Sequence, residues 1–184
     1  MPTLRATLGV KGHRPVVGTW DNKDPVYSFA ALNVVTGQLT TRLVESPAGV
    51  KRRTGHSKTA RLQHAFATHL RDLARAYPAR LGKPIILTID NAPWHQGAEI
   101  VEVLTAHPHL QLYRLPSYSP QLNLIERFWR VLRRRATHNR LFESMAGLKT
   151  ALGASFCYCH TMRHQVLSLI PSPRRRKEAK LTAA

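Results

Sequence analysis

Two carboxylates in this sequence stand beside elements of the kind that position a catalytic group. Asp90 directly follows the apolar run Ile85–Ile89, which predicts a buried strand. Glu126 lies 36 positions later (126 − 90), in the first turn of a predicted basic helix. A residue at the carboxyl end of a parallel strand faces the crevice in which α/β proteins bind their ligands. One strand–helix–strand crossover brings the two acids together, so they form a candidate catalytic pair.

Each acid also has a purely structural interpretation. Asp-Asn pairs often cap turns, so Asp90 followed by Asn91 fits a turn cap alone. Glu126 stands three positions after Asn123, which is the spacing of a capping box. It also stands four positions before Arg130, which is the spacing of an ion pair along one helix. The spacing by itself leaves these interpretations open.

The elements around the two acids alternate between strands and helices. The turn at Thr36 and Gly37 between two apolar runs predicts a hairpin, and the later runs predict a crossover. In chain order, we expect strands at 16–20, 26–35 and 38–44, a helix at 59–77, a strand at 85–89, a helix at 96–106, a strand at 110–115, a helix from 125, and one long or two short helices at 144–170. This order predicts an α/β fold with a mixed sheet flanked by helices, antiparallel first and parallel later.

The chain is strongly basic. Lys and Arg number 28 against 10 Asp and Glu, which gives a formal net charge of +18, and 20 of the 28 are Arg. This excess points to a polyanionic partner, DNA or RNA before an anionic membrane. Arginine suits phosphate because its planar fork donates two parallel hydrogen bonds, although a GC-rich genome also enriches it. No signal peptide or membrane-length apolar run is recognisable, so we expect a cytoplasmic protein that is nucleoid-associated when bound to DNA.

Two longer motifs contain the acids. Residues 88–95 read TIDNAPWH, residues 115–129 read LPSYSPQLNLIERFW, and a basic helix follows. Together they resemble the DDE catalytic domain of bacterial insertion-sequence transposases of the mariner superfamily. The resemblance extends from about Thr3 to Ile170, with Ser117 and Leu124 where that family usually has proline. It implies a ribonuclease-H-like fold.

The resemblance also implies a mechanism for the complete enzyme. Asp90 and Glu126 would be catalytic residues and ligands of Mg²⁺ or Mn²⁺ in a two-metal phosphoryl transfer. The cations would activate water or a DNA 3′-hydroxyl and stabilise the leaving oxygen. The implied substrate is DNA, as transposon ends and target, with no small-molecule substrate and with a homodimer as the candidate assembly.

The family uses three acids, and the first lies on the first strand. That strand is expected upstream of Met1, because Asp21 and Asp24, the acids nearest the start, stand in a turn. We therefore expect a catalytic domain over 1–170 that is incomplete at its N-terminus and lacks the first strand, followed by a basic disordered tail at 171–184. Such a fragment is predicted to be inactive alone. The alternative is a non-catalytic, DNA-binding transposase remnant that modulates a full-length enzyme, and another ribonuclease-H-like nuclease is a distant third.

The helix from Ile125 divides into two faces. One is an apolar stripe and the other is basic, without balancing acids, which favours phosphate binding over a merely solvated face. Trp94 and Tyr118 are candidates to stack on a base, although packing is the commoner use of such residues. The predicted DNA contacts are Asn91, His95, Arg127, Arg130, Arg133 and Arg134, of which Asn91 and His95 are alternatively expected to shape the loop after the strand.

Cys157, His160 and His164 share one face of a predicted helix. Their spacing matches no common zinc module, and a buried free cysteine is ordinary, so we do not expect zinc there. The two cysteines are also too few for a disulfide framework.

Overall fold

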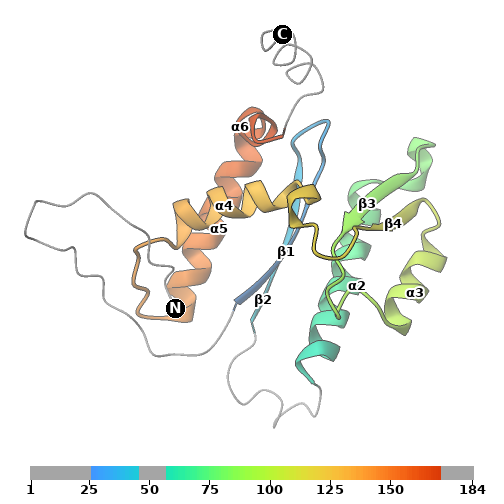
Figure 1. Cartoon of the computed structure of the whole chain (residues 1–184), viewed down its shortest axis with the longest axis horizontal. Helices are drawn as coiled ribbons and strands as arrows, with labels where there is room; N and C mark the ends of the chain where they lie inside the picture. The colour runs from blue at the N-terminus through green and yellow to red at the C-terminus, as the bar shows by residue number, and fades with distance from the viewer. Residues whose placement is uncertain (1–25, 46–56, 171–184) are drawn as a thin grey trace, which may run out of the picture.

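The computed structural model describes residues 26–45 and 57–170 (Figure 1). The expectations for strand 16–20, for Asp21 and Asp24 and for the tail at 171–184 lie outside these residues. No helix within the described ranges is long and apolar enough to cross a membrane.

The predicted hairpin is confirmed. Strand β1 (Val26–Leu32) pairs antiparallel with β2 (Leu39–Glu45), with Val26 opposite Glu45 and Leu32 opposite Leu39. Gly37 closes the turn at φ 70°, in the left-handed region that glycine adopts without strain. A Cβ atom there would lie 2.7 Å from the backbone oxygen of Arg163, so the turn also needs glycine for its close approach to the C-terminal helices.

The predicted crossover is also confirmed. Strand β3 (Ile85–Ile89) leads through α3 (Ala98–Ala106) to β4 (Leu110–Arg114), and the two strands are parallel with Ile85 opposite Leu110. The carboxyl ends of β3 and β4 therefore lie at the same edge, where Asp90 follows β3.

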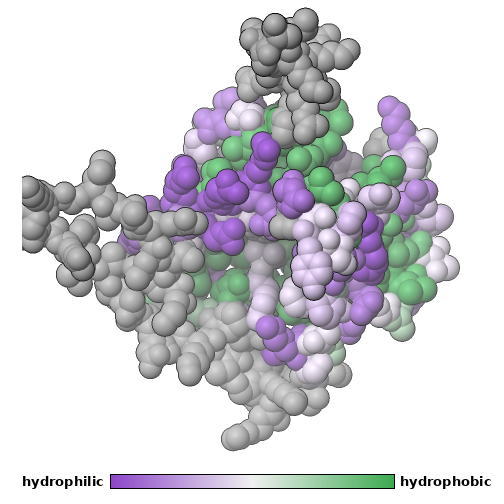
Figure 2. All heavy atoms as spheres, viewed as in Figure 1, coloured by the Kyte–Doolittle hydropathy of each residue, from purple (hydrophilic) through white to green (hydrophobic). Residues whose placement is uncertain are grey.

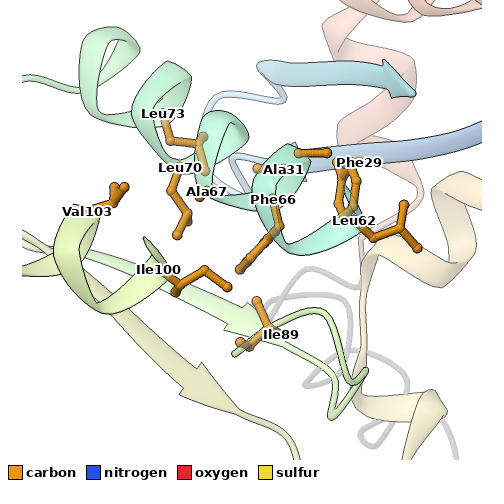
Figure 3. Packing of buried hydrophobic residues seen from close by; sticks show 11 residues of the cluster. Phe29, Ala31, Leu62, Phe66, Ala67, Leu70, Leu73, Ile89, Ile100 and Val103 are labelled. Carbon is orange, nitrogen blue, oxygen red and sulfur yellow. The ribbon is translucent and has the colours of Figure 1, made fainter. Parts of the chain in front are cut away.

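Helix α2 (Lys58–Ala76) holds the hairpin and the crossover together. Ser57 caps its start by accepting a hydrogen bond from the Ala60 N–H. Its apolar face packs on side chains of β1, β3 and α3, as Figure 3 shows. The buried members of this first core are Phe29, Ala31, Leu62, Ala65, Phe66, Ala67, Leu70, Leu73, Ile89, Ile100 and Val103.

The C-terminal helices form a second core against the hairpin. They are α4 (Ile125–Ala136), α5 (Met145–Thr161) and α6 (Arg163–Ser168), so residues 144–170 make two helices rather than one. The predicted apolar stripe of α4 packs into this core through Phe128 and Leu132, with Ile125 and Trp129 partly buried beside them. Two short 3-10 helices, Ala79–Leu81 and Pro120–Leu122, complete the described elements.

The strands make two pairs within the described residues. The sheet orders are β1-β2 and β3-β4, each two-stranded, rather than the one continuous mixed sheet that the sequence predicts. Each pair has the predicted strand direction, but no described strand joins β1 to β3. A cavity of about 480 Å³ lies between them, lined by residues 28–34 and 84–90. We call it the inter-sheet cavity.

Candidate functional site

Asp90 and Glu126 line the same open pocket. This pocket, which we call the acid pocket, has a volume of about 380 Å³ and is also lined by Asn91, Asn123 and the loop 115–119. Both acids line one end of the inter-sheet cavity as well. The crossover therefore brings the two carboxylates to one opening, from the end of β3 and from the first turn of α4.

Asp90 caps a turn with one oxygen and leaves the other open. Its Oδ1 accepts a hydrogen bond from the Ala92 N–H at 3.1 Å and lies 2.9 Å from Nδ1 of His95. The turn-cap interpretation is thus correct, but it occupies only Oδ1. Among the described residues nothing donates to Oδ2, and the side chain is 57% exposed.

His95 fixes the orientation of the Asp90 carboxylate. Its side chain is only 12% exposed, and its ring packs on Phe66 at a centroid distance of 4.3 Å. Burial lowers the pKa of His95 below its ordinary value, although Asp90 acts in the opposite direction. The neutral tautomer with a proton on Nδ1 donates to Asp90. These contacts support a loop-shaping role for His95, and a contact with DNA stays a prediction.

Glu126 makes neither of the structural contacts that its spacing permits. The residue at the helix N-cap is Leu124, whose side chain caps nothing, so no capping box with Asn123 forms. No ion pair joins Glu126 to Arg130 within the described part of the chain. Its half-buried carboxylate has no hydrogen-bond partner among the described residues and is open to the pocket.

Two side chains tie together the loops around the acid pocket. Asn91 donates from Nδ2 to the Leu115 carbonyl at 2.8 Å, which joins the loop after β3 to the loop after β4. Arg114 donates from Nη2 to the His95 carbonyl at 2.7 Å and remains exposed. The sequence analysis missed Arg114, although it ends β4 at the same sheet edge as Asp90, and that position was the available signal.

Tyr118 stands out in the loop over the pocket. Its backbone adopts φ 57°, which is uncommon for a residue other than glycine, and its side chain is completely exposed. Strained backbone of this kind clusters at functional sites. Trp94, the other candidate for stacking on a base, instead packs partly buried against the first core.

The basic face of α4 borders the acid pocket. Figure 2 shows hydrophilic side chains gathered over this helix. The predicted contacts Arg127, Arg130, Arg133 and Arg134 are all exposed, and Arg127 also donates to the Leu169 carbonyl at 3.3 Å. Arg135 lies over the Tyr158 ring at 3.6 Å, so it contributes to packing as well as to charge.

The pocket offers oxygen donors and the zinc candidate does not assemble. Oδ2 of Asp90 and the Glu126 carboxylate are hard oxygen ligands, which suit Mg²⁺ or Mn²⁺. Within the described ranges no group of three or more His, Cys, Asp or Glu side chains is placed to hold a metal ion. Cys157 is exposed, while Cys159 is buried with its thiol pKa raised by that burial.

Known proteins share this arrangement. Residues 3–149 match the family model described as DDE superfamily endonuclease. Over 144 residues the chain is 30% identical to the insertion element IS630 uncharacterized 39 kDa protein of Shigella sonnei, which covers 78% of this chain and 37% of that protein. The chain thus spans little more than a third of the length of this relative.

A solved structure has the same fold. It is the Mos1 transposase paired-end complex with left transposon end, which matches with a TM-score of 0.57 at 17% identity over 91% of this chain and 48% of the Mos1 chain. The α/β, ribonuclease-H-like fold class predicted from the sequence is confirmed.

Proposed function

This chain belongs to the DDE superfamily endonucleases, and on that premise we propose that it is the catalytic domain of a DNA transposase. The proposed reaction is cleavage and joining of DNA by phosphoryl transfer, with transposon ends and target DNA as partners and a homodimer as the assembly. Because the chain spans 37% of its insertion-element relative, the activity of a whole transposase is part of the proposal.

The observation that carries the proposal is the acid pocket. Asp90 and Glu126 come from different elements, line one opening, and keep carboxylate oxygens without a described partner. Residues held that way are disfavoured for stability alone, because like charges at one site repel each other. A site that binds cations accounts for them.

Asp90 and Glu126 would hold the divalent cation, Mg²⁺ or Mn²⁺, with Oδ2 of Asp90 free for this purpose. When bound, the cation activates an attacking oxygen and stabilises the charge on the leaving oxygen. His95 orients the first of these ligands through Oδ1, as partners of metal ligands commonly do. Asn91 and Arg114 keep the loop after β3 in place at the sheet edge.

The basic face of α4 supports DNA as the substrate. Its exposed arginines lie on the helix that carries Glu126, so a duplex tracked by them would pass over the acid pocket. Arg114 adds a further cation at the end of β4. Binding through phosphate contacts would be weakly dependent on sequence and strongly dependent on salt.

A second candidate function is DNA binding without cleavage. Within the part of the chain that the structure describes, Asp90 and Glu126 are the only carboxylates that line the acid pocket or the inter-sheet cavity. Phosphoryl transfer needs the attacking and leaving oxygens held together, which two acids would do only loosely. We therefore propose that the chain is inactive alone and needs a third acid from a further strand.

The test supplies pre-cut transposon ends with Mg²⁺ or Mn²⁺ and measures strand transfer. The chain alone should give no product, whereas a fusion with an Asp-bearing strand ahead of Met1 should give product that disappears in Asp90→Ala. Product from the unfused chain that also needs Asp90 would contradict the inactivity. An inactive fusion that still binds DNA would favour the second candidate.

A further inference from the structure

The hairpin has a free backbone edge. Asn33 donates its N–H to the Gln38 carbonyl at 2.9 Å, which marks the two as a hydrogen-bonded pair. Such pairs alternate along an antiparallel ladder with pairs whose N–H and C=O groups point outward. With the observed register, the outward groups of β1 belong to Ser28, Ala30 and Leu32.

The crossover has a matching free edge. Ile85 donates to the His109 carbonyl at 2.7 Å, and Ile89 accepts from the Leu115 N–H at 2.9 Å. In a parallel pair one residue directs both backbone groups to the same neighbour, so residues 85, 87 and 89 face β4. Ile86 and Thr88 therefore point their backbone groups to the other side.

Both free edges open into the inter-sheet cavity. Its lining includes residues 28–34 of the hairpin and 84–90 of the crossover segment. Phe66, His69 and Leu73 of α2 line it as well, and so do Ile125 and Trp129 of α4. Two strand edges and two helices thus surround one volume of about 480 Å³.

Side chains around the cavity lack the environment that their types require. His69 is 2% exposed, and neither of its ring nitrogens has a hydrogen-bond partner in the described part of the chain. The Ser28 hydroxyl is buried in the same condition. Buried polar groups are almost always paired, so these two point to an absent ligand. Ile86 is 65% exposed, although strands of parallel sheets are normally covered on both faces.

We propose that the inter-sheet cavity binds one extended polypeptide strand, which pairs with β1 on one side and β3 on the other. The occupant is a strand because both walls offer rows of backbone donors and acceptors, which an added strand satisfies. It is about five residues long, to match β3. Its side chains are apolar towards both helices, with one hydrogen-bonding side chain opposite His69.

The added strand joins the two pairs into one sheet and reaches the acid pocket. The cavity ends at Asp90 and Glu126, so the end residue of the strand lies beside them. That this residue is an acid rests on the proposed function. The docking itself rests only on the two edges, the cavity and the unpaired polar groups.

Amide hydrogen exchange tests the docking without DNA or metal. The probe is the peptide segment Thr-Val-Ile-Val-Asp, fused ahead of Met1 through a flexible Gly/Ser linker, which holds it at a millimolar effective concentration. In the unfused chain the amides of Ser28, Ala30, Leu32, Ile86 and Thr88 should exchange rapidly. In the fusion those that pair should exchange about tenfold more slowly or less, as ladder amides do.

Two matched controls make the result specific. A fusion with proline at the second and fourth probe residues cannot donate its ladder hydrogen bonds and should leave the edge amides unprotected. Ile86→Asp should reduce protection in the fusion, whereas Val101→Asp, a comparably exposed position on α3, should not. Edge amides that are protected in the unfused chain, or unprotected in the fusion, would overturn the proposal.

The exchange result and the activity result separate the two proposals. Protected edges without strand transfer would leave the docking intact and count against the transposase function. Strand transfer without protection would count against the docking alone.

Discussion

Replacing His69 with leucine should stabilise the protein, and increasingly so as the pH falls. Burial lowers the pKa of His69 from 6.5 to about 4, with Asp72 acting in the opposite direction. The unfolded chain therefore binds more protons than the folded one between these values, and the histidine's contribution to stability is lost as the pH falls through that window. At about 1.36 kcal/mol for each pH unit, the loss is about 3 kcal/mol by pH 4.

At pH 7 a smaller gain is expected from the same substitution. The buried imidazole lacks a partner among the described residues, and an unsatisfied group of this kind costs roughly 1–3 kcal/mol. Leucine has a similar size and leaves the packing beside Phe29 in place. His69→Leu should thus gain roughly 1–3 kcal/mol at pH 7 and about 3 kcal/mol more at pH 4.

Urea unfolding of both proteins at pH 7, 5.5 and 4 measures the difference. Comparing the two proteins cancels the titration of other groups, including His95, whose pKa is also lowered by burial. A difference in unfolding free energy that stays constant across the three pH values would refute the reasoning, because a constant difference means that His69 does not titrate abnormally.

Further substitutions test the DNA face, the acid pocket and the packing of α3. Changing Arg130, Arg133 and Arg134 together to alanine should shallow the plot of log affinity against log salt by up to about 2.7, about 0.9 for each phosphate contact, in a fluorescence-anisotropy salt series; an unchanged slope would exclude this face. His95→Ala should weaken Mn²⁺ binding about tenfold because Asp90 loses its positioning partner, and equal binding in an EPR titration would contradict that role. Glu99→Gln should lower the unfolding free energy by roughly 0.5–1 kcal/mol, because this carboxylate joins α3 to α2 through two partly exposed ion pairs; urea unfolding at pH 7 tests it.

The sequence predicts the local elements well because their causes are local. Alternating and helical apolar spacing marks the hairpin, the crossover and the C-terminal helices, all of which the structure confirms. The turn at Gly37 and the apolar stripe of α4 follow from the same kind of pattern. The family and the fold class are predictable because residues 88–95 and 115–129 carry long, specific motifs.

What the sequence could not predict depends on contacts between distant segments. Spacing made a capping box for Glu126 as plausible as a pocket, and only the position of α4 over the strands decides between them. The stacking of His95 on Phe66 joins residues that are far apart in the chain. The separation of the strands into two pairs is equally non-local, because pairing depends on which strands are present to fill the sheet.

The central claim is that Asp90 and Glu126 act together as one cation-binding site, and a Mn²⁺ titration followed by EPR tests it most directly. Asp90→Asn and Glu126→Gln should each weaken the same binding event about tenfold or more, and the double variant should lose little beyond either single change, since the two side chains act as a unit. Glu143→Gln, an exposed acid outside both cavities, serves as the control and should bind as the unaltered chain does. Absence of Mn²⁺ binding by the unaltered chain, or independent and additive losses in the two variants, would contradict the claim.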